Sequence, residues 1–399
     1  MNATSNQQSF IKVLASLCIA CLLNGCAVTP HELDSLGQDP QQRFSRQVEL
    51  PQNYQAAVNR FTNASANHSS HIKALSSTTF SRGDMLRLRF AGMPSLDGLY
   101  QINTDGQIEL PFAKSLVATG QNRQSLQTLI ETEMVQSKWF YIDNAKVDIS
   151  LVRLAAVDVA VFGAVFNPGR VSVNNQPTQK QEDAIQQTAG AFTSGRNLVA
   201  ALMASGGIRP DADLFEVYLK RANTTYKIPL NALLSGDEFT KTPALINGDV
   251  IFVKSIGVEN QKLIRPSQIT PPGMRVFMSN ATAPVFSNAQ AAVGADSTRL
   301  PYGSSLLDAA ISANCVGGTH MANASRSLIL VTRNYGSQQQ LVIKRSINQL
   351  LAQSSNSSVN PHLMPDDGIA CYDSRFSNFR DVARGISEVV SPIFLGGLL

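Results

Sequence analysis

Tryptophan is almost absent from this chain, with only Trp139 among 399 residues, so no platform of stacked aromatic rings for sugars or bases is visible. Charge is also sparse: 16% of residues are charged and the net charge is +4, which is too weak and too dispersed to indicate a nucleic-acid partner. The sequence has no glycine-rich dinucleotide loop, Walker loop or nucleophile elbow. No set of nucleophile, base and orienting residue stands out, so we expect a protein that is not an enzyme and uses no cofactor.

The N-terminal stretch has the pattern of an export signal. Lys12 precedes an apolar run at 13–23, which is too short to span a bilayer and is typical of a secretory h-region. The run ends in Leu23-Asn24-Gly25-Cys26, which resembles a bacterial lipobox, so we expect 1–25 to be a signal peptide and Cys26 to carry lipid. Ala27, rather than Asp, follows the cysteine, which in lipoprotein signals of this kind favours sorting to the outer membrane. An ordinary cleaved signal or an uncleaved anchor is the alternative. Residues 26–75, rich in Gln, Asn and Ser, would then be a tether.

Export would also decide the fate of the five cysteines. Cys18 and Cys21 leave with the signal and Cys26 is lipidated, so Cys315 and Cys371 remain in an oxidising compartment. We expect these two to form a disulfide, worth roughly 4 kcal/mol in the chain-entropy model, with two buried free thiols as the alternative. The five histidines show no ligand spacing with the cysteines, so no metal site is expected.

Residues 82–134 carry the clearest alternation in the chain. A turn feeds a strand at 82–90, and apolar residues then alternate with polar ones on both sides of the turn at 103–106, which predicts a hairpin closed at Gly106. Pro111 stops the second strand. Leu126, Leu129, Ile130 and Met134 follow helical spacing, so a helix is expected to cover the sheet, and a further strand is expected at 146–154.

The same residues carry a resemblance to a known family. Gly83-Asp84 before a strand, followed by Tyr-x-Ile-x-x-x-Gly-x-Ile-x-Leu-Pro from Tyr100 to Pro111, resembles the polysaccharide-export domain of the outer-membrane export lipoproteins of the Wza type. The resemblance implies such a domain at 76–154. Without it, the pattern indicates only a small α+β domain.

A second kind of unit occurs twice after this domain. Its first copy, at 155–255, has two strands around an Asn-Pro-Gly turn, a helix at 197–204 ended by Gly206-Gly207, a strand at 214–221, a short helix at 230–234 and a strand at 247–253. The second copy, at 256–375, repeats this order with an opening hairpin at 274–286, helices at 305–313 and 345–352, and strands at 327–333 and 365–372. The order resembles the soluble-ligand-binding β-grasp module that the export lipoproteins carry in tandem.

Glycine–aspartate pairs precede three of the expected strands. They are Gly83-Asp84, Gly248-Asp249 and the inverted Asp367-Gly368. Paired carboxylates for glycoside hydrolysis need one shared cleft, and here each pair belongs to a separate unit. We therefore interpret them as turns, in which Asp bonds its own backbone.

The C-terminal segment at 376–399 is strongly amphipathic. As a helix, residues 377–395 would be roughly 28 Å long, close to the thickness of a bilayer core. One face carries an apolar stripe, made of Phe379, Val382, Ala383, Ile386, Val389, Val390, Ile393 and Phe394. The other face is polar, with Arg380, Arg384, Ser387, Glu388 and Ser391.

A single copy of this helix would expose Arg384 and Glu388 to hydrocarbon, at a cost of roughly 2.5–3.5 kcal/mol for each charge. A ring of copies would face the stripe to lipid and the polar residues to a water-filled lumen, which is the arrangement that the resemblance implies. The helix could also lie flat in the membrane interface or pack on its own domain.

Together these features predict an α+β multidomain chain: an export domain, two β-grasp-like repeats and a C-terminal amphipathic membrane helix. The resemblance implies an outer-membrane lipoprotein, its bulk in the periplasm and its C-terminus at or beyond the cell surface. It would form a homo-oligomeric channel exporting capsular or extracellular polysaccharide, docked to an inner-membrane polysaccharide co-polymerase of the tyrosine-kinase type. The alternative is a lipid-anchored glycan-binding or adaptor protein that forms no pore.

Overall fold

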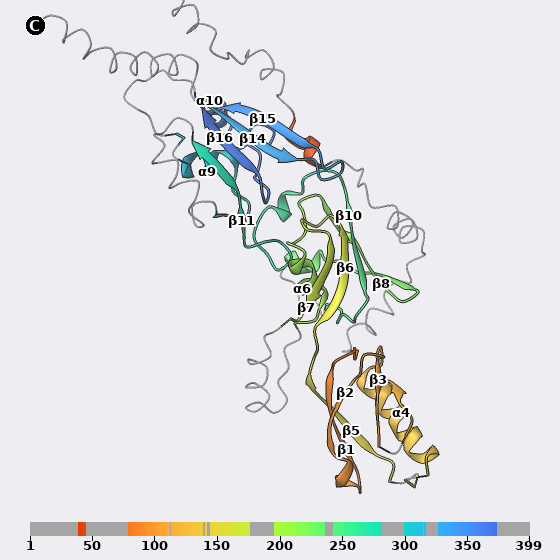
Figure 1. The fold of residues 1–399 in the computed structure, drawn as a ribbon. Helices are drawn as coiled ribbons and strands as arrows, with labels where there is room; N and C mark the ends of the chain where they lie inside the picture. The colour runs from red at the N-terminus through yellow and green to blue at the C-terminus, as the bar shows by residue number, and fades with distance from the viewer. Residues whose placement is uncertain are drawn as a thin grey trace, which may run out of the picture.

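The computed structural model describes residues 39–44, 79–111, 113–138, 140–141, 144–175, 195–235, 242–280, 299–313, 315–316 and 326–372. Three sheet-containing units follow one another along an elongated molecule (Figure 1). The unit of residues 79–154 lies at one end in orange, and the unit that ends in the blue strands lies at the other. Several sheets with few helices confirm the predicted α+β class. No helix in the described part of the chain is both long and apolar enough to cross a membrane.

The first unit is a three-stranded antiparallel sheet with one long helix against it. Its elements are β1 Met85–Phe90, η2 Pro94–Leu96, β2 Gly98–Gln101, α4 Arg123–Gln136 and β5 Val147–Arg153, with strand order β2-β1-β5. The side chain of Asn122 caps α4 by accepting the N–H of Ser125. The predicted helical stripe is confirmed, because Leu126, Ile130 and Met134 are buried in the core of this unit.

The predicted hairpin in this unit is wrong in its pairing. The turn itself forms, with Gly106 at a φ of 80°. However, β2 pairs with β1, whereas β3 Gln107–Ile108 pairs with β4 Leu116–Val117. The side-chain oxygen of Asn103 accepts the N–H of Asp105 at 3.1 Å and of Gln107 at 2.9 Å. The turn therefore closes on its own side chain and starts a separate two-stranded ribbon.

The second unit is built on a five-stranded sheet in the order β7-β6-β10-β8-β9. Its elements are β6 Val157–Gly163, β7 Gly169–Val173, α6 Leu198–Ala204, β8 Ala212–Arg221, β9 Thr224–Lys227, α7 Ala232–Ser235 and β10 Val250–Ser255. The predicted stop of α6 is confirmed: Gly206 and Gly207 take φ of 80° and 85°, and the Gly207 N–H donates to the Leu202 carbonyl at 2.9 Å.

The third unit is built on a four-stranded sheet in the order β12-β16-β14-β15. Its elements are β12 Phe277–Asn280, α9 Leu306–Ser312, β14 Ser327–Arg333, β15 Gln340–Ser346, α10 Ile347–Ala352 and β16 Gly368–Tyr372. A small ribbon of β11 Gly273–Arg275 and β13 Arg299–Pro301 adjoins it, and η3 Gln261–Leu263 lies between the second and third units.

The two larger sheets share one pairing scheme. β6 is parallel to β10, which is antiparallel to β8, which is antiparallel to β9; β12, β16, β14 and β15 repeat this series. The N-caps of α6 and α9, Asn197 and Ser305, also form equivalent lone bridges to Ala244 and His362. The internal duplication that the sequence predicts is therefore visible in the hydrogen-bond pattern.

Two details of the second copy were predicted wrongly. The opening hairpin at 274–286 is not one, because β11 pairs with β13 and β12 runs parallel to β16. Residues 345–346 belong to β15, which the sequence did not indicate, and α10 begins only at Ile347. The predicted signal peptide, Cys26 and the predicted C-terminal helix at 376–399 lie outside the described residues.

Candidate functional site: the buried contacts that join the units

The three aspartates singled out in the sequence form the same local structure. Each carboxylate accepts the backbone N–H of the residue three positions earlier, at 2.7 Å for Asp84, 2.9 Å for Asp249 and 2.8 Å for Asp367. All three side chains are buried. They act as turn residues ahead of β1, β10 and β16, as the sequence predicts, and a buried carboxylate held in this way is not displayed to a substrate.

The residue before each aspartate takes a left-handed backbone conformation. Gly83 and Gly248 have φ of 82° and 86°, and the third position is Asp366, with φ of 67°. The inverted pair Asp367-Gly368 was therefore the wrong alignment: the equivalent pair is Asp366-Asp367. Asp is one of the few residues besides Gly that occupies this region with little strain, so the turn survives the replacement.

Asp84 also joins the first unit to the second. Its Oδ1 accepts a hydrogen bond at 2.7 Å from Arg196, and both side chains are 0% exposed. The same oxygen accepts the N–H of Ala155 at 2.8 Å, and the other arm of Arg196 donates to the carbonyl of Thr79 at 2.7 Å. Burial raises the pKa of Asp84, although the positive charge of the Arg196 guanidinium acts to lower it. Two residues 112 positions apart thus form one buried ion pair across the junction.

A second ion pair lies beside the first. Arg221 contacts Asp249 through two nitrogens, at 3.0 and 2.7 Å, and also donates to the hydroxyl of Thr79 at 3.4 Å. The hydroxyl of Ser81 accepts the N–H of Asn247 at 3.2 Å. The segment that leads into β1 is therefore held by the arginines of both ion pairs, Arg196 and Arg221, at Thr79.

The junction between the second and third units is aromatic. The ring of Tyr335 stacks on Phe44 with centroids 6.1 Å apart and meets Phe166 edge-on at 6.0 Å. The guanidinium of Arg209 lies 4.8 Å from the centre of the Tyr335 ring and is held in place by Asp211 at 2.6 Å. Phe44 comes from the N-terminal segment, Phe166 and Arg209 from the second unit and Tyr335 from the third, so three parts of the chain meet here.

The N-terminal segment η1, Pro40–Phe44, is seated on this junction. Arg43 is 1% exposed and donates to the His362 carbonyl at 2.7 Å, while a second nitrogen lies 3.5 Å from the carboxylate of Glu259. The backbone of η1 is held too, since the Arg43 carbonyl accepts the N–H of Tyr335 at 2.9 Å. Nothing in the local sequence of residues 40–44 predicts this, because the contacts with Glu259, Tyr335 and His362 are made more than two hundred positions away.

Asp367 lacks the arginine that its counterpart has. In the second unit, Arg221 at the end of β8 lies opposite Asp249. In the third unit, the equivalent position opposite Asp367 is Thr332 on β14. Burial raises the pKa of Asp367 to about 6, although Arg43 opposes the shift from a distance. The third unit therefore contains a carboxyl group that takes up a proton at a higher pH than an exposed aspartate does.

This predicts a dependence of stability on pH with a definite sign. An acid whose pKa is raised on folding contributes stability that is complete below its unfolded pKa of about 4 and is lost as the pH rises through about 6. Between pH 4 and 7.5 we expect the free energy of unfolding of the wild type to fall by roughly 2–3 kcal/mol. Asp367→Asn should remove this fall without breaking the turn, because the amide oxygen can still accept the Met364 N–H. The free energy of unfolding of the third unit, measured for the wild type and the variant across this pH range, tests the prediction. Asp249→Asn is the control and should destabilise at pH 7.5, since it leaves Arg221 unpaired; a wild type with equal stability at both pH values would contradict the prediction.

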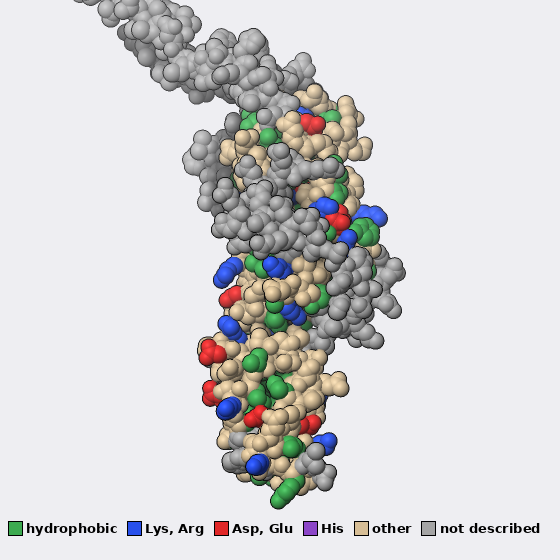
Figure 2. All heavy atoms as spheres, turned by 90° about the vertical axis from the view of Figure 1, so that its right-hand side faces the viewer, with side chains coloured by type: hydrophobic (Ala, Val, Ile, Leu, Met, Phe, Trp, Pro, Cys, Tyr) green, Lys and Arg blue, Asp and Glu red, His purple; other side chains and the backbone are tan. Residues whose placement is uncertain are grey.

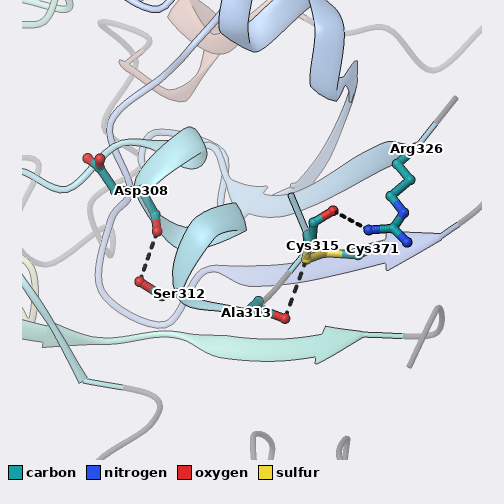
Figure 3. Close-up of a disulfide and its surroundings, with 6 residues drawn as sticks. All are labelled: Asp308, Ser312, Ala313, Cys315, Arg326 and Cys371. Atoms are coloured by element: carbon teal, nitrogen blue, oxygen red, sulfur yellow. Dashed lines mark hydrogen bonds between the residues drawn. A yellow bond between two sulfur atoms is a disulfide. The ribbon is translucent and has the colours of Figure 1, made fainter. Parts of the chain in front are cut away.

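Cys315 and Cys371 form a disulfide (Figure 3). Cys315 follows α9 and Cys371 lies on β16, so the bond ties the helix to the strand beside it. The guanidinium of Arg326 donates to the Cys315 carbonyl at 3.1 Å, so the backbone of Cys315 is held by this hydrogen bond as well as by the disulfide. Both cysteines are buried in the core of the third unit.

The surface of the described residues carries charges of both signs. Figure 2 shows lysine, arginine and acidic side chains interspersed on one face, with hydrophobic side chains scattered between them. Within the described residues, no three histidine, cysteine or acidic side chains gather in a way that could hold a metal ion. The predicted stripe and polar face of the C-terminal helix and the predicted lipidation at Cys26 lie outside the described residues and stay predictions.

Comparison with known proteins gives matches for part of this chain. Residues 73–152 match the model of the polysaccharide biosynthesis/export protein family, which coincides with the first unit. Two curated relatives, both named polysialic acid transport protein KpsD from Escherichia coli, are 27% identical over 173 residues, covering 42% of this chain and 27% of each relative. The chain thus spans about a quarter of the length of the curated relatives it matches. Through its residues 73–152, the first unit of this chain is therefore similar to the polysaccharide biosynthesis/export protein family.

Proposed function

We propose that this protein is the subunit of an outer-membrane lipoprotein channel that exports capsular or extracellular polysaccharide. The family match of the first unit supports polysaccharide export, and the duplicated sheets support two β-grasp repeats behind it. Its domains would be those expected from the sequence: a signal at 1–25, a lipidated tether at 26–75, an export domain at 76–154, repeats at 155–255 and 256–375, and a membrane helix at 376–399.

The observation that carries this proposal is the seat of η1 on the third unit. Cys26 precedes Pro40 by 14 residues, so a lipid on it would reach no farther than roughly 50 Å from this seat. The proposed membrane helix begins just after β16, which is in the same unit. Both candidate membrane contacts would therefore lie nearer the third unit than the export domain, which is at the opposite end of the elongated molecule (Figure 1).

This polarity suggests how such a channel would be arranged. The third unit would meet the outer membrane, with the C-terminus at or beyond the surface, and the export domain would point into the periplasm towards an inner-membrane co-polymerase. Subunits would associate head to tail around an axis, since only a closed heterologous interface gives a ring with one lumen. Conduction would need weak contacts at many sites, because tight binding stalls a passing polymer.

The test is the mass of the detergent-extracted, lipidated protein, together with export of surface polysaccharide in cells that lack the native gene. We expect a discrete assembly of many subunits. Deleting residues 377–399 should abolish membrane insertion and export while leaving the disulfide and the fold of residues 39–372 intact. A monomer or dimer held on membranes by its lipid alone, with export unaffected by the deletion, would overturn the channel and favour a lipid-anchored adaptor.

A further inference from the structure

The second unit has a pocket that the channel proposal leaves unused. Its volume is about 780 Å³, within the range of roughly 300–1,000 Å³ that is typical of ligand sites. One wall is the start of β8, at Asp213 and Phe215; another is α7; the third is the segment from Ile256 to Arg265 that follows β10.

The third wall is held by hydrogen bonds to the residues just before β8. The Ile256 N–H donates to the Asp211 carbonyl at 2.8 Å, and the Asn260 N–H donates to the Pro210 carbonyl at 2.9 Å. The hydroxyl of Ser255 donates to the Asp211 carboxylate, which also holds Arg209. The pocket is therefore backed by a buried polar network, and its shape exists before any ligand arrives.

The side chains around the pocket combine an aromatic surface with positive charge. Phe215 is 60% exposed, so one ring face is available to the apolar side of a sugar ring. Lys262 and Arg265 are also exposed at the pocket, and no carboxylate among the described residues lies within ion-pair distance of either. Two unneutralised cations beside an exposed ring suit a carboxylate carried on a sugar.

The remaining polar groups suit the hydroxyls of the same sugar. The carboxylate of Asp213 accepts the Phe215 N–H at 2.9 Å through one oxygen, which leaves the other free to accept from a hydroxyl group. The side-chain oxygen of Asn260 accepts the Lys262 N–H at 3.1 Å, so its amide NH₂ is directed elsewhere as a donor. A site with acceptor, donor, ring and cations matches an acidic sugar better than a neutral one.

We propose that this pocket binds an acidic sugar unit of the exported polysaccharide, with the sugar carboxylate on Lys262 and Arg265 and the ring on Phe215. The inference rests on the proposed function and adds to it the chemical class of the polymer. Binding is weak and reversible, because the site is open and its cations are exposed to solvent and salt.

The probe is a fluorescent oligomer of α-2,8-linked sialic acid, with a neutral dextran oligomer of equal length for comparison, and the protein is the full detergent-extracted chain. We expect the acidic oligomer to bind in a salt-dependent way and the dextran to bind at least tenfold more weakly. Lys262→Glu with Arg265→Glu should weaken acidic binding roughly 10- to 100-fold, and Phe215→Ala roughly tenfold. The control Lys114→Glu with Arg170→Glu, exposed residues outside the pocket, makes the same change in net charge and should leave binding unchanged.

Several results would overturn the proposal: equal binding of both oligomers, equal loss in the control variant, or no change in either pocket variant. A second copy of the chain as the true occupant would appear as a smaller assembly in the pocket variant. The proposed function fails separately, when the wild-type chain does not restore surface polysaccharide or does not assemble. A wild type that exports and assembles but does not bind the acidic oligomer would refute the pocket alone.

Discussion

Replacing Arg196 with alanine is expected to lower the free energy of unfolding by roughly 3–5 kcal/mol, because it leaves the Asp84 carboxylate buried without its cation. Both side chains are 0% exposed, so water cannot replace the lost partner. The carbonyl of Thr79 loses its donor in the same change. We expect the first unit to separate from the second, seen as an earlier unfolding transition and as faster hydrogen exchange in β1 and β5.

The matched control is the pair of Arg123 and Asp148. Its nitrogen and oxygen are 2.6 Å apart, about the same as in the buried pair, but the side chains are 62% and 57% exposed. Arg123→Ala should therefore cost no more than about 1 kcal/mol. Equal effects of the two substitutions would contradict the argument from burial.

The effect of Arg196→Ala should also depend on pH. Burial already raises the pKa of Asp84, and removing the guanidinium can only raise it further. The deficit should be largest at pH 7.5 and should shrink as the pH falls and the carboxyl group takes up a proton. In a double-mutant cycle, Asp84→Asn with Arg196→Met should cost less than the sum of the single changes, because neither charge is then stranded.

Periodicity in the sequence was sufficient for most of the secondary structure. The alternation at 146–154 and 157–173 and the helical spacing from Leu126 to Met134 each rest on residues a few positions apart, and all appear as expected. Pairing was harder. The alternation around Gly106 correctly indicated extended chain and a turn, but which strand lies beside which depends on β1 and β4, and on the Asn103 side chain that closes the turn.

The buried polar contacts could not be predicted. Arg196 gives no local signal, because its partner lies 112 positions earlier in another unit. Arg43 sits in a polar stretch that reads as a tether, yet it is almost fully enclosed by residues of the third unit. The equivalence of Asp366-Asp367 with the two Gly-Asp turns was missed because composition suggested glycine, whereas the backbone requires only a residue that tolerates a positive φ.

These missed contacts explain how a chain of small units can act as one body. Each unit has its own core, but the two ion pairs at Thr79 join the first unit to the second, and the Tyr335 cluster joins the second to the third. In the channel that we propose, such joints would keep the three units aligned between the two membranes.

The disulfide is the other contact with a large expected effect. It closes a loop of 56 residues, and the chain-entropy model gives a stabilisation of about 4 kcal/mol for a loop of that size. Cys371 lies one residue before the end of β16, from which the proposed membrane helix departs. The bond therefore holds the strand at the point where the membrane segment would pull on it.

Reduction is accordingly expected to destabilise the third unit by about 4 kcal/mol and to leave the first unit unchanged. Hydrogen exchange in β14 and β16, measured in denaturant with and without reductant, reports on the third unit, and exchange in β1 and β5 reports on the first. Cys315→Ala with Cys371→Ala is the control, since reductant should then have no effect. If reduction left exchange in β14 and β16 unaltered, the third unit would be held by its core and by η1 alone, and the cysteines would contribute only as buried apolar groups.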